Sequence, residues 1–134
     1  MNQETCEITT TTKGQIIDVM PQIMRFLAGC APTGSGILLV NSPHTTAGVM
    51  VNEKTDPHVR QDILKHMARL VPNDSGFAHL EGNSDAHIKT LLTGVSIQLP
   101  VIVGKPVLGT WQTVFFCEYD GPRKRELILT FHHK

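Results

Sequence analysis

The alternation of hydrophobic and polar positions predicts a chain built mainly of β-strands. Threonine-rich ETCEITTTT (4–12) alternates loosely, and apolar runs of strand length recur further along the chain. Gly and Pro mark turns between the later runs, at 104–106 and 120–122. The predicted strands are 4–12, 15–19, 36–43, 46–53, 95–103, 107–119 and 126–133. Because 46–53 follows 36–43 so closely, we expect these two strands to pair.

Helical periodicity appears in three segments, 18–32, 55–72 and 83–94. The second is the clearest, because Asp56 is a natural N-cap and Pro57 a natural first helical residue. Its apolar residues recur at helical spacing and form a stripe. They are Val59, Ile63, Met67 and Leu70.

This order of elements predicts an α+β fold. Strands outnumber helices and cluster toward the C-terminus, a pattern that suits a mainly antiparallel β-sheet or sandwich with two or three helices packed on it. It does not fit a doubly wound parallel sheet. The length of 134 residues suits a single domain, 1–134.

Composition narrows the classes of function. Twelve basic and twelve acidic residues cancel, so we expect no nucleic-acid partner. No apolar run approaches the roughly 20 residues of a membrane span, and the N-terminus has no signal-peptide pattern. Three cysteines without a CxxC motif favour a reducing compartment, so we expect a cytoplasmic protein. Cys117 lies in an apolar run and is expected to be a buried, inert thiol.

Three of the seven histidines are candidates for a site. His44, His79 and His87 each lie at the edge of a predicted element, beside small or turn-forming residues. Three neutral imidazoles are a common ligand set for zinc, with a fourth position left for water or a ligand. The alternative is three ordinary polar loop histidines. His58 and His66 lie off the apolar stripe of their helix and are expected at the surface.

The start of the third helix, together with two arginines, predicts an anion site. Asn83 or Ser84 caps this helix, and unpaired N–H groups at a helix N-terminus attract phosphate. The carboxylate of Asp85 opposes this prediction if it occupies the same position. Arg123 and Arg125 share one face of a strand and suit bidentate phosphate binding, with a solvated basic turn as the alternative.

Two carboxylates and the single tryptophan complete the candidates. Glu53 or Glu118 serves as a general base, or orients a histidine, if its side chain faces inward; otherwise it faces solvent. Trp111 either packs in the core or flanks an aromatic substrate.

Five separated motifs, taken together, resemble the secondary thiamine-phosphate synthase family. They are PHTTAGVMVNE, DPHVRQDIL, HLEGNSDAHIK, PVIVGKPVLGTWQ and EYDGPRKR, and the resemblance runs from about Gly36 to the C-terminus. The family's motifs match His44–Ala47, Asn52–Glu53, His79, Gly82–Asn83 with Ala86–Lys89, Gly109–Gln112, and Glu118 with Asp120–Arg123.

The resemblance implies a homotrimer with a site at or near the subunit interface. It also implies a transferase that joins hydroxymethylpyrimidine diphosphate to thiazole phosphate. In that reading Arg123 and Arg125 hold the leaving diphosphate. Asn83, Ser84 and Trp111 bind the substrate, and the expected cofactor is zinc at the histidines or magnesium on the diphosphate. Two other functions stay open: a metal-assisted hydrolase with Glu53 or Glu118 as base, and a trimeric module that binds a metal or a phosphorylated metabolite.

Overall fold

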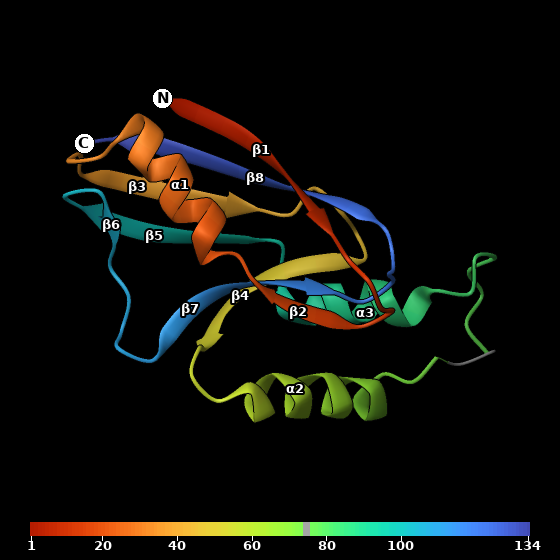
Figure 1. Ribbon diagram of the computed structural model, residues 1–134. Helices are drawn as coiled ribbons and strands as arrows, with labels where there is room; N and C mark the ends of the chain where they lie inside the picture. The colour runs from red at the N-terminus through yellow and green to blue at the C-terminus, as the bar shows by residue number, and fades with distance from the viewer. Residues whose placement is uncertain (74–75) are drawn as a thin grey trace.

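The computed structural model describes residues 1–73 and 76–134, which form strands and helices in mixed order (Figure 1). The strands are β1 (Asn2–Thr9), β2 (Gln15–Asp18), β3 (Gly36–Asn41), β4 (Ala47–Glu53), β5 (Ser96–Ile102), β6 (Lys105–Pro106), β7 (Gln112–Glu118) and β8 (Lys124–His133). The helices are α1 (Met20–Cys30), α2 (Pro57–Leu70) and α3 (Ser84–Thr93).

The strands form two antiparallel sheets, which confirms the predicted α+β fold. One sheet has the order β1-β8-β3-β5-β6 and the other β2-β7-β4. The expected pairing of 36–43 with 46–53 is wrong. β3 pairs with β5 and β8, whereas β4 pairs with β7 in the other sheet. The loop between β3 and β4 therefore carries the chain from one sheet to the other.

Strand β7 lies between two hydrophobic cores, and this explains its unbroken apolar run. Successive side chains of a strand point to opposite faces. Val114 and Phe116 pack in the large core between the two sheets and α1, while Phe115 and Cys117 pack on the α2 and α3 side. Cys117 is completely buried, as expected, and burial raises the pKa of its thiol to about 12.

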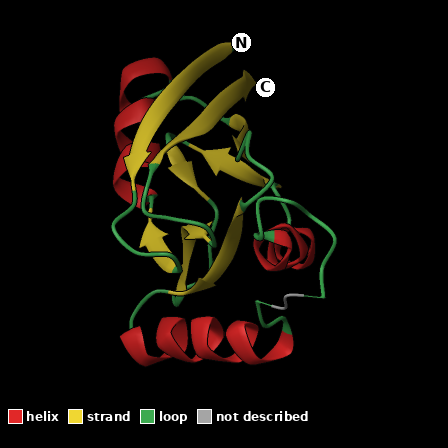
Figure 2. Ribbon diagram, turned by 90° about the vertical axis from the view of Figure 1, so that its right-hand side faces the viewer, coloured by secondary structure: helices red, strands yellow, loops and turns green. Residues whose placement is uncertain are grey.

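The three helices cover different parts of the sheets (Figures 1 and 2). Helix α1 buries Ile23, Phe26 and Leu27 against the large core. Helix α2 has no fully buried residue, although Ile63 and Met67 pack partly on the smaller core. Only part of the predicted apolar stripe therefore packs on the core, and Leu70 at its end is exposed.

Two stretches near β6 differ from the expectation. Residues 107–111 form no strand, and Trp111 is 62% exposed in the connection that leads into β7. Lys105 and Pro106, where a turn was predicted, pair with the end of β5. In the described part of the chain, no helix is long and apolar enough to cross a membrane.

Candidate functional site

A polar hollow of about 360 Å³ opens where β3, β4, α3 and β8 meet. We call it the histidine pocket, because it brings together the three histidines that were singled out from the sequence. Its lining comes from the β3–β4 loop, the segment before α3, the first turn of α3 and the start of β8. The residues are Pro43, His44, Thr45, Thr46, His79, Glu81, Asn83, His87, Arg123 and Arg125.

His44 is held in one orientation and one protonation state. Its ring atom Nε2 accepts the backbone N–H of Glu126 at 2.8 Å, so this nitrogen carries no proton. Burial and the nearby charge of Arg125 lower the pKa of His44, which favours the neutral ring. The Nδ1–H of the neutral ring is then left as a donor.

His79 and His87 form an edge-to-face pair. Their ring centroids are 5.3 Å apart and the rings are nearly perpendicular, at 87°. The two histidines meet because the Gly82-Asn83 turn folds the segment before α3 back onto the first turn of the helix. No side chain or backbone group of the described residues forms a hydrogen bond with either ring. Within residues 1–73 and 76–134, neither imidazole has a hydrogen bond that would compete with a ligand.

The predicted three-histidine metal centre is wrong. Within residues 1–73 and 76–134, no three His, Cys, Asp or Glu side chains are grouped so that they could hold a metal ion. The backbone contact of His44 gives a physical reason, because the lone pair of its Nε2 already accepts a hydrogen bond. A magnesium ion that arrives with a substrate stays a prediction.

Glu118 and Arg125 form a buried ion pair beneath the pocket. The side chains are 0% and 4% exposed, and the guanidinium binds both carboxylate oxygens. Burial alone would raise the pKa of Glu118, but hydrogen bonds from Arg125 and Thr10 hold the pKa below its ordinary value. Arg125 also donates to Thr46 at 2.7 Å and so fixes the loop that carries His44.

Arg123 reaches the rim of the pocket through the Asp-Gly-Pro-Arg turn. Its guanidinium donates to the backbone oxygen and the carboxylate of Asp120, at 2.8 and 2.9 Å. Asn83 donates to the same carboxylate oxygen at 2.8 Å, so Asp120 joins the turn to α3. Gly121 is required here, because a Cβ atom would lie 2.3 Å from the backbone oxygen of Thr12.

The start of α3 lacks a side-chain cap. Asn83 occupies the N-cap position, but its side chain caps no N–H group, and no other side chain of the described residues binds the first N–H groups. Its amide nitrogen donates to Asp120 instead. Asn83 is only 9% exposed, and its Oδ1 atom has no hydrogen-bond partner in the described residues. Asp85, which was expected to compete for this position, instead pairs with Lys89 and Lys13. Its carboxylate therefore leaves the helix start open.

Two predicted site residues lie away from the pocket. In the β4–β7 register Ala47 faces Glu118, whereas Glu53 faces Gln112 at the other end of the strands, about 20 Å along β4. Trp111 precedes β7 at that same distant end. Ser84 adjoins the pocket as the first residue of α3. Their predicted roles in catalysis or substrate binding stay predictions.

Sequence reasoning missed Thr46, Asp120 and Glu81. Thr46 and Asp120 lie inside the motifs HTTA and DGPR, which contain the histidine and arginine that were selected. Their position in these motifs was the sequence signal that could have identified both as site residues. They connect charged groups across the pocket, and these contacts depend on the β3–β4 loop and the start of α3 lying beside the segment that joins β7 to β8.

Known proteins match this chain over nearly its whole length. A family model described as "UPF0047 protein YjbQ-like" matches residues 4–134. A UPF0047 protein of Methanocaldococcus jannaschii is 45% identical over 92% of this chain and 88% of its own. YugU of Bacillus subtilis is 41% identical over 94% and 96%.

Solved structures share the fold. An uncharacterized conserved protein of Clostridium acetobutylicum has a TM-score of 0.92 at 37% identity, covering 96% of this chain and 99% of its own. A hypothetical protein of Aeropyrum pernix has a TM-score of 0.94 at 32% identity and covers both chains completely.

These matches overturn the family resemblance inferred from the motifs. The family model, the Methanocaldococcus and Bacillus relatives and the Clostridium structure carry UPF0047 names. Neither these nor the Aeropyrum protein is named for thiamine phosphate synthesis. The thiamine-phosphate synthase activity is therefore a wrong prediction. The alternatives, a metal-assisted hydrolase and a module for a metal or phosphorylated metabolite, find no support either.

Proposed function

Since the chain belongs to the YjbQ-like UPF0047 family, whose name assigns no activity, we propose its function from the pocket itself. The histidine pocket binds a small molecule through an oxyanion group, and His79 and His87 exchange a proton with that molecule. The observation that carries this proposal is the edge-to-face pair of His79 and His87, whose rings bind no other described group, beside Arg123 and the uncapped start of α3.

Three features of the pocket favour an oxyanion. The first N–H groups of α3 have no cap, and the positive end of a helix dipole stabilises negative charge. Arg123 is half-exposed at the rim, and two groups of its guanidinium are fixed by Asp120, which leaves the remaining NH2 group to bind a ligand. His44 adds a neutral donor whose direction is set by Glu126.

Two further features favour acid–base chemistry. Histidine is the side chain whose ordinary pKa lies nearest neutrality, so an imidazole both accepts and donates protons there. His87 stands on the rigid first turn of α3, and His79 packs against its ring. Glu81, also in the lining, is exposed and opposes the bound anion, so its negative charge weakens rather than strengthens binding.

We place this activity in the cytoplasm, because Cys6, Cys30 and Cys117 are all free thiols and reducing compartments keep thiols in that state. An inorganic oxyanion and an organic carboxylate are the two sources of a suitable group. Inorganic phosphate and acetate serve as probes for the two sources.

The test is a titration of each probe followed by NMR of the histidine ring protons. We expect phosphate, acetate or both to shift the His79 and His87 signals saturably and to leave those of His58 unchanged. His58 is the internal control, because it lies exposed on α2, where its ring pairs with Asp56 outside the histidine pocket.

Two variants separate binding from proton transfer. His87→Asn keeps a polar side chain but cannot titrate, so the His79 shift on phosphate binding should change while the fold is retained. His58→Asn should behave as wild type. Saturable binding that leaves both ring signals of the pocket unmoved, or no binding of either probe, would contradict the proposal.

A further inference from the structure

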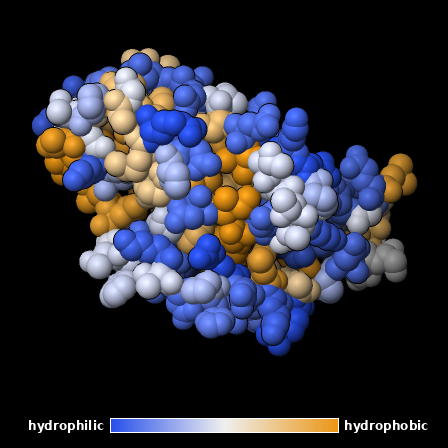
Figure 3. All heavy atoms as spheres, in the orientation of Figure 1, coloured by the Kyte–Doolittle hydropathy of each residue, from blue (hydrophilic) through white to orange (hydrophobic). Residues whose placement is uncertain are grey.

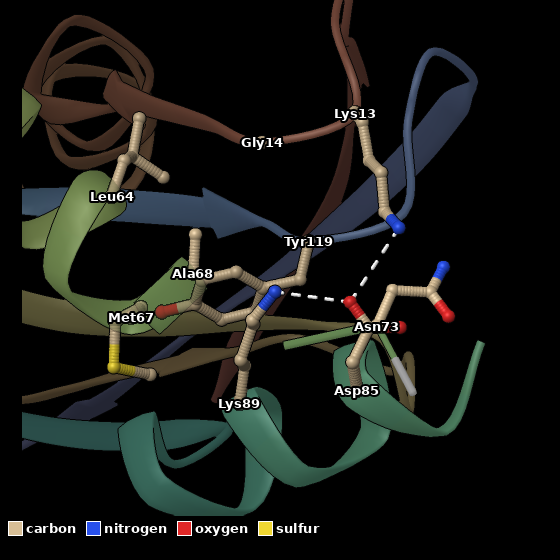
Figure 4. A pocket seen from close by; sticks show the side chains of 9 residues that line it. All are labelled: Lys13, Gly14, Leu64, Met67, Ala68, Asn73, Asp85, Lys89 and Tyr119. Atoms are coloured by element: carbon tan, nitrogen blue, oxygen red, sulfur yellow. Dashed lines mark hydrogen bonds and ion pairs between the residues drawn. The ribbon is translucent and has the colours of Figure 1, made fainter. Parts of the chain in front are cut away.

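A second hollow, of about 250 Å³, lies on the other side of α3 from the histidine pocket. We call it the lysine pocket and define it by Lys13, Leu64, Met67, Asp85, Lys89 and Tyr119 (Figure 4). Asn83 and His87 face the histidine pocket, whereas Asp85 and Lys89 face this one. Each pair is four residues apart, so each occupies one face of the helix.

The lysine pocket holds three charged groups, two ammonium groups and one carboxylate, whose charges do not cancel. The Nζ atoms of Lys89 and Lys13 both approach Oδ2 of Asp85, at 3.0 and 3.5 Å. They come from different elements, Lys89 from α3 and Lys13 from the turn between β1 and β2, and converge on one oxygen in Figure 4. Two ammonium groups and one carboxylate leave one positive charge, and most of their N–H donors have no described partner.

One oxygen of the buried Asp85 carboxylate has no hydrogen-bond partner among the described residues. The side chain of Asp85 is 1% exposed, yet its Oδ1 atom has no hydrogen-bond partner in residues 1–73 and 76–134. Burial by itself raises the pKa of Asp85, but the hydrogen bonds and charges of Lys89 and Lys13 bring it below its ordinary value. A charged, buried oxygen without a donor is costly, and a ligand that donates to it removes that cost.

The α2 side of the lysine pocket is apolar, whereas Asn73 adds a polar amide to the lining. Leu64 and Met67 of α2 lie on one side, and the hydroxyl group of Tyr119 is occupied by Thr93 at 2.5 Å. A hydrated inorganic ion gains nothing from such walls, whereas an organic body buries apolar surface against them.

From this arrangement we propose that the lysine pocket binds a small organic carboxylate with an aliphatic body and an adjacent hydrogen-bond donor, that is, a 2-hydroxy or 2-amino acid. The carboxylate lies between the ammonium groups of Lys13 and Lys89, and the hydroxyl or amino group donates to Oδ1 of Asp85. The aliphatic body packs on Leu64 and Met67. This site is independent of the function proposed for the histidine pocket.

The test is calorimetric titration of the whole chain with three matched probes: 2-hydroxy-4-methylpentanoate, leucine and 4-methylpentanoate. The last has the same body and carboxylate but no donor. We expect 2-hydroxy-4-methylpentanoate, leucine or both to bind at least about tenfold more tightly than 4-methylpentanoate, because one hydrogen bond to a charged group is gained. The order of the first two identifies which donor the site selects.

Variants assign the binding to this pocket. Lys13→Met should weaken binding of the hydroxy or amino acid about tenfold, and its half-exposed side chain makes the exchange safe for folding. Lys54→Met, in the loop after β4, is the matched control and should bind as wild type. Asp85→Asn should remove the preference over 4-methylpentanoate. Arg123→Ala should change nothing here, because Arg123 belongs to the other pocket.

The proposal is overturned if none of the three probes binds saturably at millimolar concentration. It is equally overturned if Lys13→Met binds as wild type, or if 4-methylpentanoate binds as tightly as the other two. Should Asp85→Asn fail to fold, the probe series on wild type and Lys13→Met still decides the question.

Discussion

At the scale of single residues, Arg123 and Arg125 differ in what their charges do, although they are two residues apart on the same strand end. Arg125 is buried, and its guanidinium binds Glu118 and Thr46. Arg123 is half-exposed at the pocket rim. Their shared face led us to expect a joint phosphate site from the sequence. The contacts of Arg125 hold the site together, whereas those of Arg123 leave part of its guanidinium available for the ligand that we propose.

Replacing Arg123 by Ala should therefore weaken phosphate binding about 10- to 150-fold, the worth of one charge-assisted contact. Arg123→Lys should recover only part, because lysine keeps the charge and loses the planar fork. The free energy of unfolding should change by less than about 1 kcal/mol, since the ion pair with Asp120 is at the surface. Calorimetry and thermal melts check both statements, with Arg69→Ala on α2 as control. Equal binding by wild type and Arg123→Ala would remove Arg123 from the site.

Replacing Glu118 by Gln should destabilise the protein by about 3–5 kcal/mol at pH 7, because Arg125 is left buried without its counter-charge. The folded-state pKa of Glu118 is lowered, so its contribution is fully present above the unfolded value of about 4.3 and is lost as pH falls below it. The difference in unfolding free energy between wild type and Glu118→Gln should thus shrink from pH 7 to pH 3. Urea titrations at both pH values measure it, with exposed Glu7→Gln as control; a constant difference would contradict the assigned pKa.

At the scale of elements, α2 is attached more weakly than any other helix. It has no fully buried residue: Ile63, Leu64 and Met67 are only partly buried against the smaller core, and the guanidinium of Arg60 lies over the ring of Phe115. We expect its amide hydrogens to exchange faster than those of β7, which lies between two cores. Hydrogen exchange followed by mass spectrometry tests this, and equal protection of the two elements would show that α2 is held by contacts not described above.

Elements were predictable where local pattern decides them. Asp56 and Pro57 begin α2 as expected, because a cap and a fixed φ act within one turn. The partners of β3 and β4 were not predictable in this way, since two apolar runs of the same predicted length fit either sheet. The histidine pocket was found in part, because its residues lie in turns that punctuate the chain. The lysine pocket was missed although Asp85 and Lys89 have the i,i+4 spacing of a helical ion pair, because Lys13 reaches them only through tertiary structure.

At the scale of the whole molecule, apolar surface and strand edges favour self-association. Leu91 and Leu92 on α3 are 79% and 57% exposed, and Ile102 and Val103 are 60% and 58% exposed. Hydrophobic colour shows at the end that carries β5 and β6 (Figure 3). Closed oligomers bury such patches and edges.

From these exposed patches and edges we propose a homotrimer. Sedimentation equilibrium at micromolar concentration should report about three times the chain mass of 14.8 kDa. Leu91→Lys should shift the population toward smaller species, whereas exposed Lys54→Met should not. A stable monomer of wild type would contradict the prediction.

The central claim is that the histidine pocket binds an oxyanion, and a crystal structure of the protein soaked in inorganic phosphate tests it most directly. We predict a phosphate ion that contacts the guanidinium of Arg123, the first N–H groups of α3 and the ring of His79 or His87, at the 2.7–3.2 Å typical of hydrogen bonds. A pocket that stays free of phosphate at saturating concentration, or an ion bound to Arg123 alone without α3 and the histidines, would contradict the account.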